Sequence, residues 1–579
     1  MQVWVASRAR RKSLPAGLHE WIDDNEDAWL PFAGHVDRRN RWVSKSGRTA
    51  IHSWDNGQAV VECDIASGEG GSATTASGYL HDRGALISHQ ALDRQLANAS
   101  DVSAEIGALG GVFAAVRVDA SDRISAWASR GRLRSIFYAV GPDLITVSNR
   151  PHVAHLLARQ SRASDFDDDY AAELLASGLV APCATPFRGV RQLADGARLE
   201  ITPNGEVIEI EEEMVPGPDV AGTVDDAAGA LIAAISVLSE LEVDIESGLT
   251  GGKDSRLIAC LLHEAGVPFS TFTAGADSHP DVVLAREVAA TLGVAHRTRI
   301  PQAASDPEAV DFDARISGAL RGADAMLPAY DAPMAVFAPA GGPIRLTGAG
   351  GEVLRGGLAK VPDDDRDFLV RKLTWEMTVN SRYLTAQATE HALTRVPVWM
   401  ARCDHLPTPH VLSWYHRDIR LGRWNMGRML QRTGQFDVQP FLDNQAIRAA
   451  MTLPIEERAS ERAFRSILDS INPAVAEMPL ATSTWRFDTK KKRLAHAGPV
   501  YNWRLDLSGM AGRRLFARID SSPSQDRIFS IVNKDAFERL RTNCEAGKND
   551  GAQRPGMFLW GLATLCAMWD EDWNRPCPT

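Results

Sequence analysis

A short glycine-rich stretch carries the clearest chemistry in this sequence. Residues 243–257, VDIESGLTGGKDSRL, combine strand-like apolar positions with the start of a helical pattern, so a glycine turn joins a strand to a helix. Gly251 and Gly252 allow unusual φ angles and leave no side chains in the way, so backbone N–H groups can approach an anion closely. The helix start adds free N–H groups and the positive end of its dipole, and Thr250 and Ser255 add hydroxyl groups. The stretch therefore predicts a cradle for pyrophosphate.

The spacing of this loop differs from that of a Walker A motif. A Walker A motif needs a glycine, four residues and then Gly-Lys-Ser/Thr, whereas residues 252–254 are Gly-Lys-Asp. The order TGGKDS over residues 250–255 resembles instead the SGGxDS signature of the PP-loop ATP pyrophosphatases, which split ATP between its α and β phosphates. The plain alternative is a glycine turn without a ligand. The six-residue match, placed directly after a strand, favours the phosphate loop.

The composition is that of an ordinary soluble globular protein. The chain has 579 residues, which favours two to four domains, with 44% hydrophobic and 24% charged residues. Its formal net charge of −11 argues against a nucleic-acid partner, and no apolar run approaches the length of a membrane span. The basic cluster at residues 8–12 is followed by no apolar segment, which argues against a secretory signal. Seven scattered cysteines without a CxxC pair indicate a reducing compartment with no disulfide framework or zinc site, so we expect a cytoplasmic protein.

Residues 1–215 favour a β-rich domain. Alternating apolar positions and turn signals predict strands at residues 48–54, 59–65, 111–118, 124–128, 135–140 and 144–147, a helix at 167–178 and a hairpin at 199–210. An acidic run at residues 211–213 followed by Pro-Gly-Pro at 216–218 marks the best domain boundary.

The second predicted domain covers residues 224–579 and begins with an α/β pattern. Helices are expected at 225–239 and 281–292, and strands at 269–272 and 343–346, the last leading into a second glycine loop at 347–357. After about residue 365 the pattern is mainly helical. The last helix, 557–573, has apolar residues at helical spacing, which predicts a packed core face.

Several stretches together resemble the asparagine synthetase superfamily, which includes β-lactam synthetases and the macrolactam cyclases of lasso peptides. The matching stretches are 131–138, 187–196, 250–255, the FDVQPFLD segment at 436–443 and the tryptophan-rich end. The match covers most of the chain from about residue 105. The resemblance implies an N-terminal Ntn-hydrolase-like β-rich sandwich and a C-terminal PP-loop domain, a parallel α/β sheet with a helical extension.

The N-terminal domain departs from the family at its nucleophile. The family's glutaminase uses the cysteine directly after the initiator Met, but position 2 here is Gln2. Cys63 and Cys183 lie inside the chain and cannot supply an N-terminal nucleophile. The resemblance therefore implies a degenerate glutaminase domain without glutamine hydrolysis, a loss shared by β-lactam synthetases and lasso cyclases.

The second glycine loop also departs from the family pattern SGEGSDEVFGG, although its spacing is equal. Glu352 falls where the family has a magnesium-binding Asp, and a longer carboxylate still offers oxygen to a hard cation. Ala349 falls where relatives have a catalytic Glu or Tyr, and because alanine cannot move a proton, any general base comes from elsewhere. Gly348 and Gly350 are expected to line the ATP site by the same resemblance.

The family's late catalytic lysine, in an R-x-K-x-x-F pattern, aligns with Thr484 if Phe487 is the anchor. The nearest lysines are at 490–492, and Lys490 is the candidate catalytic residue. These lysines fit a solvated basic run equally well as a flexible loop that neutralises transition-state charge.

The resemblance implies a carbon–nitrogen ligase that uses ATP and Mg²⁺. Asp254 and Glu352 would hold magnesium while a substrate carboxylate attacks the α-phosphate, giving an acyl-adenylate and pyrophosphate, and an amine then displaces AMP. Phe272 would lie against the adenine. Lys253 and Arg256 are further phosphate candidates that fit a solvent-facing position equally well.

Three classes of function stay open. The first is a synthetase that makes an intramolecular amide, either a lasso macrolactam or a lactam, with a small-molecule or peptide carboxylate as substrate and a precursor peptide and an accessory peptidase as partners. The second is an asparagine-type synthetase that uses ammonia from solution or from a partner protein. The third is a non-catalytic relative, suggested by Ala349 and the displaced lysine and opposed by the intact loop at 250–255.

Overall fold

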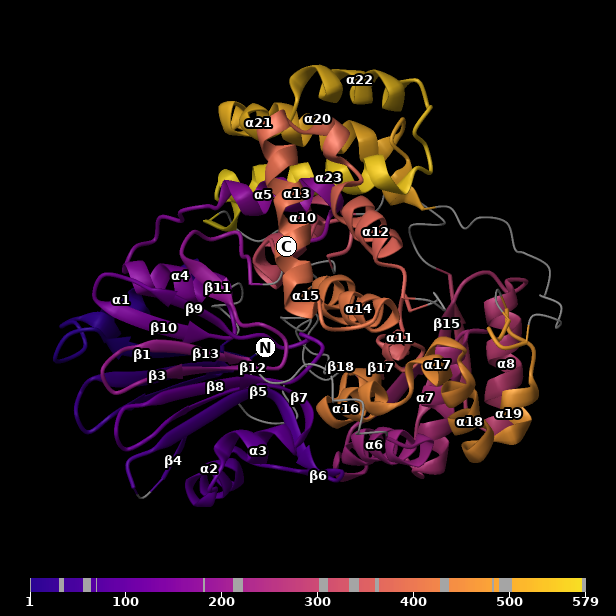
Figure 1. The fold of residues 1–579 in the computed structure, drawn as a ribbon, viewed down its shortest axis with the longest axis horizontal. Coiled ribbons are helices and arrows are strands. Elements are labelled where there is room, and N and C mark those ends of the chain that lie inside the picture. Colours follow the sequence, from indigo (N-terminus) through magenta and orange to yellow (C-terminus); the bar gives the residue numbers. More distant parts are fainter. Residues whose placement is uncertain are drawn as a thin grey trace.

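The computed structural model describes twelve segments of the chain. They are residues 2–30, 36–55, 64–68, 70–180, 183–211, 222–300, 311–332, 343–359, 364–426, 437–481, 484–488 and 502–574. Figure 1 shows a β-rich region on the left, an α/β region on the lower right and a helical region at the top.

The N-terminal domain contains two antiparallel sheets. Its strands are β1 (Gln2–Ala9), β2 (Arg38–Val43), β3 (Thr49–Asp55), β4 (Ala66–Ser67), β5 (Ala73–Asp82), β6 (Ala85–Leu86), β7 (Gly110–Val118), β8 (Ile124–Ala128), β9 (Phe137–Val140), β10 (Leu144–Ser148), β11 (Val190–Gln192), β12 (Ala197–Ile201) and β13 (Val207–Glu211). The first sheet has the order β11-β9-β10-β1-β3-β2. The second has the order β13-β12-β8-β7-β5-β4, with β6 paired to β5.

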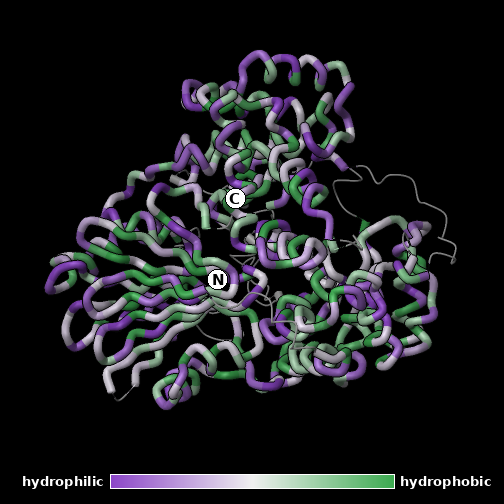
Figure 2. The backbone as a smooth tube through the Cα atoms, viewed as in Figure 1, coloured by the Kyte–Doolittle hydropathy of each residue, from purple (hydrophilic) through white to green (hydrophobic). Residues whose placement is uncertain are grey.

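The two sheets pack face to face, and helices cover the outer face of each, so the domain has four layers separated by hydrophobic cores. Alternate side chains of β1 face opposite ways, so Val3 and Val5 join the core outside the first sheet while Trp4 and Ala6 join the core between the sheets. The outer layers are formed by α1 (Leu18–Asn25) and α4 (Pro151–Arg159) on the first sheet, and by α2 (His89–Asn98) and α3 (Val102–Gly107) on the second. Figure 2 shows hydrophobic stretches along these strands. The helix–sheet–sheet–helix sandwich confirms the predicted Ntn-hydrolase-like fold.

The C-terminal domain is built on a parallel sheet. Its strands are β14 (Ile245–Gly248), β15 (Ser270–Ala274), β16 (His296–Arg299), β17 (Ile344–Leu346) and β18 (Asp437–Val438), in the order β16-β15-β14-β17-β18. The helices α6 (Val224–Ser236), α7 (Lys253–Glu264) and α8 (Pro280–Leu292) share one core with it. Because the strands are parallel, the loops after β14 and β17 leave the sheet at the same edge.

The remaining described residues are mainly helical, which confirms the prediction for the chain after about residue 365. The helices are α5 (Asp168–Ser177), α10 (Phe312–Ala323), α11 (Gly351–Leu354), α12 (Arg366–Thr378), α13 (Ala386–Met400), α14 (Thr408–Tyr415), α15 (Gly422–Met426), α16 (Asn444–Thr452), α17 (Ile455–Ala459), α18 (Arg462–Ile471), α19 (Pro473–Glu477), α20 (Met510–Asp520), α21 (Gln525–Ile531), α22 (Lys534–Glu545) and α23 (Gln553–Trp569). Every residue of α23 from Phe558 to Trp569 is buried, which confirms the predicted core face. Among the described helices, none is long and apolar enough to cross a membrane.

The two domains contact each other through the PFLD segment. Asp443 caps the start of α16, and its other carboxylate oxygen accepts a hydrogen bond from the backbone N–H of Gly111 and lies 2.8 Å from Nε2 of His81 on β5. Both side chains of this pair are almost completely buried. The predicted boundary between residues 211 and 224 falls mostly on residues outside the described segments and stays a prediction.

Most of the predicted elements are present with small shifts at their ends. The predicted helix at 225–239 ends earlier, at Ser236, and continues as a 3₁₀ turn, Val237–Glu240. The predicted strand at 59–65 lies almost entirely outside the described residues.

Candidate active site at the phosphate loop

The glycine loop follows the central strand β14 and leads into α7. Neither Gly251 nor Gly252 uses a positive φ, so the expectation of an unusual backbone angle is wrong at these two positions. Space is the reason for glycine at 251, because a Cβ there would stand 2.5 Å from the Cβ of Ala481 and 3.0 Å from Leu284. The loop therefore packs under the segment that contains Ala481.

The N–H groups of the turn are bound within the loop, whereas the start of α7 is open. The N–H groups of Thr250, Gly251 and Gly252 donate to Ser255 Oγ, Asp281 Oδ1 and Thr250 Oγ1 at 3.0, 3.0 and 3.1 Å. The hydroxyls of Thr250 and Ser255 lie 2.9 Å apart. No described side chain caps α7. Its first N–H groups and positive dipole end are therefore the part of the loop that suits an anion.

The second glycine loop packs directly against the start of α7. A Cβ on Gly348 would stand 2.7 Å from the Cβ of Asp254 and 2.7 Å from the backbone nitrogen of Ser255. Gly350 has a φ of 90°, a left-handed conformation that favours glycine, and opens α11, which carries Glu352. The structure thus brings the two loops together at one edge of the sheet.

Asp254 is a half-buried carboxylate beside two further charges. The Nε and Nη2 atoms of Arg355 donate to its two oxygens at 2.9 and 2.7 Å. Burial raises the pKa of Asp254 to about 6, against the opposing effect of Arg355, and the negative charge of Glu352 raises it further. The ionised form of Asp254 is therefore destabilised, and a nearby cation such as a metal ion would stabilise it.

Two carboxylates on adjoining loops are a suitable donor set for magnesium. No group of three or more His, Cys, Asp or Glu side chains that could hold a metal occurs among the described residues. Magnesium bound to a nucleotide needs only one or two protein carboxylates, because phosphate oxygens and water complete its shell. Asp254 and Glu352 therefore fit a metal that arrives with ATP.

Comparison with known proteins identifies the family. The asparagine synthase family model matches residues 228–571, more than half of the 579-residue chain. The chain belongs to the asparagine synthase family. No curated protein matches it significantly. Among solved structures, the allosteric regulatory enzyme of purine biosynthesis is 9% identical with a TM-score of 0.25, over 52% of this chain and 80% of that one, a likeness too weak to carry an argument.

Membership of the asparagine synthase family agrees with the presence of two glycine loops, but it does not predict the direction of the Lys253 side chain at the start of α7. Lys253 is 7% exposed, and its Nζ lies 2.5 Å from Glu461 Oε2 and 2.9 Å from the carbonyl oxygen of Thr484. It also stands 5.0 Å above the ring of Trp485. Lys253 thus reaches the backbone of Thr484, the residue that aligns with the family's late lysine if Phe487 is the anchor. Lys490 itself lies outside the described residues.

Arg256 has a structural position. Its guanidinium is fully buried and donates to the carbonyl oxygens of Val475, Met478 and Pro479, at and beyond the end of α19. These contacts anchor α7 to the segment that follows α19. Nη2 also makes a long 3.5 Å contact with the carbonyl oxygen of Gly251, and Nε has no hydrogen-bond partner among the described residues.

Phe272 lies on β15 opposite Gly248, at the edge where the loops emerge. Three guanidiniums surround its ring at 5.4–5.8 Å, those of Arg297, Arg299 and Arg345. Buried Glu246 binds two of them, Arg297 and Arg345. The ring is therefore placed by charged neighbours. Its predicted contact with adenine stays a proposal.

Three residues that the sequence did not single out border this site. They are Arg355, Glu461 and His416. His416 is 5% exposed, and neither of its ring nitrogens has a hydrogen-bond partner among the described residues. Burial lowers its pKa to about 4, and Glu352 opposes that shift. Arg355 lies within the second glycine loop at 347–357, whereas Glu461 and His416 come from distant segments, and their only sequence signal is their residue type.

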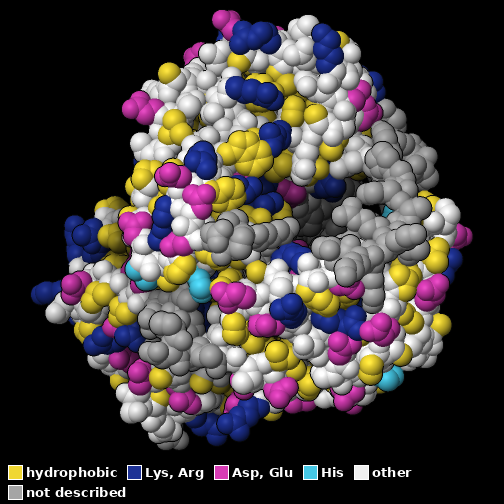
Figure 3. Space-filling model, turned by 45° about the vertical axis from the view of Figure 1, so that its right-hand side comes forward, with side chains coloured by type: hydrophobic (Ala, Val, Ile, Leu, Met, Phe, Trp, Pro, Cys, Tyr) yellow, Lys and Arg dark blue, Asp and Glu magenta, His cyan; other side chains and the backbone are white. Residues whose placement is uncertain are grey.

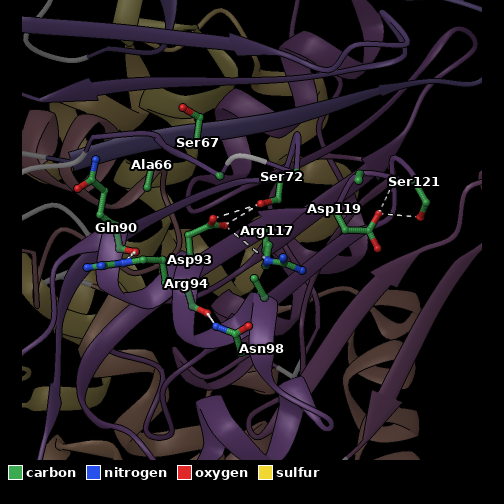
Figure 4. Close-up of a pocket in the computed structure, with 14 residues that line it drawn as sticks. Ala66, Ser67, Ser72, Gln90, Asp93, Arg94, Asn98, Arg117, Asp119 and Ser121 are labelled. Carbon is green, nitrogen blue, oxygen red and sulfur yellow. Dashed lines mark hydrogen bonds and ion pairs between the residues drawn. The ribbon is translucent and has the colours of Figure 1, made fainter.

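Figure 3 shows a hollow between the helical region above and the α/β region below, with Lys and Arg side chains at its margin. A separate cavity of about 830 Å³ lies in the N-terminal domain, beside α2. Figure 4 shows its Asp93 facing Ser72 and Arg117, so its main charged groups are paired with one another.

At the start of β1, Gln2 is closed in by its own domain. Its Oε1 accepts a hydrogen bond from the N–H of Gly78 at 2.7 Å, and its carbonyl oxygen accepts one from Asn149 Nδ2 at 2.9 Å. Gln2 is 5% exposed. Of the two cysteines that the sequence excluded as nucleophiles, Cys63 lies outside the described residues, and burial raises the pKa of the Cys183 thiol.

Proposed function

We propose that the protein is an ATP-dependent amide synthetase that adenylates a carboxylate, releases pyrophosphate and joins the carboxylate to an amine. Family membership supports a ligase that forms carbon–nitrogen bonds. The observation that carries the proposal is the uncapped start of α7 within the TGGKDS loop, packed against the loop that carries Glu352. Such a helix start binds phosphate through free N–H groups and its dipole.

The residues of the chain bind and align the reactants. ATP lies on the loop 250–255, along Gly348 and Gly350, with its adenine toward Phe272. Magnesium, held by Asp254 and Glu352, supplies charge neutralisation for the phosphates. The carboxylate oxygen bonds to the α-phosphorus as the bond to the bridging oxygen breaks, and the electron pair leaves with pyrophosphate.

The amine partner is proposed to belong to the same substrate, which gives a lactam or a macrolactam such as that of a lasso peptide. The hydrogen bonds of Gln2 within its own domain support this choice, since a glutamine held in this way is not a nucleophile that could release ammonia from free glutamine. A peptide substrate brings a precursor peptide and an accessory peptidase as partners. Asparagine-type amidation with ammonia is the alternative. Lys490 is the proposed catalytic lysine in either case.

The exchange of labelled pyrophosphate into ATP tests the adenylation. The protein is incubated with ATP, Mg²⁺ and a panel of carboxylates and precursor peptides, each with and without free ammonia. Exchange that depends on one carboxylate or peptide and needs no ammonia supports the intramolecular synthetase. If the protein binds ATP but no carboxylate or peptide of the panel supports exchange, the proposed adenylation is contradicted.

A further inference from the structure

Glu461 is a strained residue at the centre of the charges beside the phosphate loop. Its φ is 68°, in the left-handed region that a residue with a side chain rarely adopts. Its side chain is 1% exposed, and the residue lies between α17, which ends at Ala459, and α18, which begins at Arg462. Strain of this kind persists where surrounding contacts over-determine it, and it gathers at functional sites.

The contacts that hold Glu461 are with three cations. Lys253 Nζ lies 2.5 Å from Oε2, Arg355 Nη1 donates to Oε1 at 3.2 Å, and the backbone N–H of Arg486 donates to Oε2 at 3.0 Å. The Arg486 guanidinium is also 3.4 Å from Oε1. One carboxylate therefore gathers cations from the start of α7, from the turn after α11 and from the segment 484–488.

The cluster is continuous with the phosphate loop. Arg355 grips Asp254 with two nitrogen atoms and Glu461 with the third, and Arg486 Nη1 donates to the carbonyl oxygen of Arg355 at 2.9 Å. The side chains of Arg355 and Arg486 are 13% and 24% exposed, so one side of the cluster is accessible. If the Asp254 carboxylate leaves Arg355 to bind a metal ion, Lys253, Arg355 and Arg486 still share the negative charge of Glu461.

We propose that Glu461 positions Lys253, Arg355 and Arg486 as a clamp for inorganic pyrophosphate, which rests on the proposed function because pyrophosphate is its leaving group. Lys253 is the contact closest to the loop and neutralises the charge that the departing pyrophosphate gains as it takes the electron pair of the broken P–O bond. Glu461 acts through these cations and does not touch the ligand. Three positive charges close together repel one another, which costs free energy unless an anion lies between them. The buried carboxylate of Glu461 is that anion when no ligand is bound.

Thermal unfolding in the presence of inorganic pyrophosphate tests the clamp. Glu461→Gln keeps the size of the side chain but removes the shared counter-charge. The matched control is Asp324→Asn, which removes the anion of another buried pair, Arg150–Asp324, whose side chains are each 1% exposed. Both substitutions remove the negative charge that neutralises a buried cation, but only Glu461→Gln does this at the site where pyrophosphate is expected to bind.

Both variants should melt below the wild-type protein. Pyrophosphate, added with and without Mg²⁺, should raise the melting temperature of Glu461→Gln more than that of the wild-type protein, because the ligand replaces the lost negative charge. The shift for Asp324→Asn should equal the wild-type shift. An equal shift in all three proteins, or no shift in the wild-type protein, overturns the clamp.

Titration calorimetry with pyrophosphate gives a second measurement that does not depend on how stable Glu461→Gln is. Lys253→Met should weaken pyrophosphate binding by about tenfold to a hundredfold, the loss expected for one charged hydrogen bond, and Lys253→Arg should restore most of it. Unchanged affinity in Lys253→Met overturns the clamp and leaves adenylation intact. Formation of ADP in place of AMP would overturn the proposed function without any bearing on these binding data.

Discussion

The start of β1 and the end of β14 are both polar sites on central strands, and they differ in how their polar groups are satisfied. Around Gln2, side-chain amide and backbone groups bind one another. Around Asp254, the helix start is uncapped and buried charges are held together by a strained residue. Polar groups that satisfy each other stabilise a fold, whereas desolvated charges and open N–H groups are maintained for a ligand.

Removal of the two loop carboxylates should have the largest effect. Asp254→Asn and Glu352→Gln should each lower turnover by roughly two to three orders of magnitude with little loss of folded protein, because each removes charge from one metal site. The double variant should be little worse than either single one, since both act on the same ion. Steady-state kinetics and circular dichroism check this.

Multiplicative losses in the double variant would separate the two residues. Glu352 would then act independently of the metal, and the loop at 347–357 would share only its residue spacing with the family's magnesium-binding loop.

The close approach of the two glycine loops can be tested with a methyl group. Gly348→Ala should lower turnover about tenfold or more and unfolding free energy by about 1–3 kcal/mol, because its Cβ would meet Asp254 and the backbone of Ser255 at 2.7 Å. Gly229→Ala, in the middle of α6 with nothing within 4 Å of its Cβ, should instead stabilise by about 0.5–1 kcal/mol. Denaturant unfolding compares the two, and an equally active Gly348→Ala would contradict the contact.

The raised pKa of Asp254 predicts a pH dependence of stability. The pKa of about 6 in the folded state lies above the ordinary value of 3.8, so the protonated form is favoured by folding. Its contribution to the unfolding free energy is full below pH 3.8 and is lost as the pH rises through about 6. Asp254→Asn should remove up to about 3 kcal/mol of this dependence, measured by denaturant unfolding between pH 4 and 7. Parallel curves for both proteins would show that Asp254 is not desolvated.

The region around Gln2 should show the smallest effect on activity. Gln2→Ala should lower the unfolding free energy by about 1–3 kcal/mol, because the N–H of Gly78 loses its buried acceptor, without changing turnover. Gln90→Ala, on the exposed side of α2, should be close to neutral. Neither variant nor the wild-type protein should release glutamate from glutamine. Stoichiometric glutamate release would show that the N-terminal domain is not degenerate.

Local sequence rules predicted the elements whose ends carry turn chemistry. The hairpin over residues 137–148 turns at Gly141-Pro142, and the hairpin over residues 197–211 turns at Pro203-Asn204-Gly205, as predicted. The strand–glycine–helix pattern predicted the phosphate loop for the same reason. By contrast, β1 has both faces buried, so the alternation that predicts a half-exposed strand is absent.

The charges around the loop could not be predicted in this way. Lys253 and Glu461 are 208 residues apart, and only the packing of α18 and the segment 484–488 against α7 brings them together. The same holds for Arg355 and Asp254. Resemblance to a family predicts the two glycine loops, but it does not show which cations surround them.

The transfer of oxygen from the carboxylate substrate to AMP tests the central claim most directly. A carboxylate identified by pyrophosphate exchange is labelled with ¹⁸O and converted with ATP to the amide, and the products are analysed by mass spectrometry. Attack of the carboxylate on the α-phosphate predicts one ¹⁸O atom in AMP and unlabelled pyrophosphate. ADP together with ¹⁸O-labelled phosphate would contradict the assignment of α–β cleavage to the loop at residues 250–255.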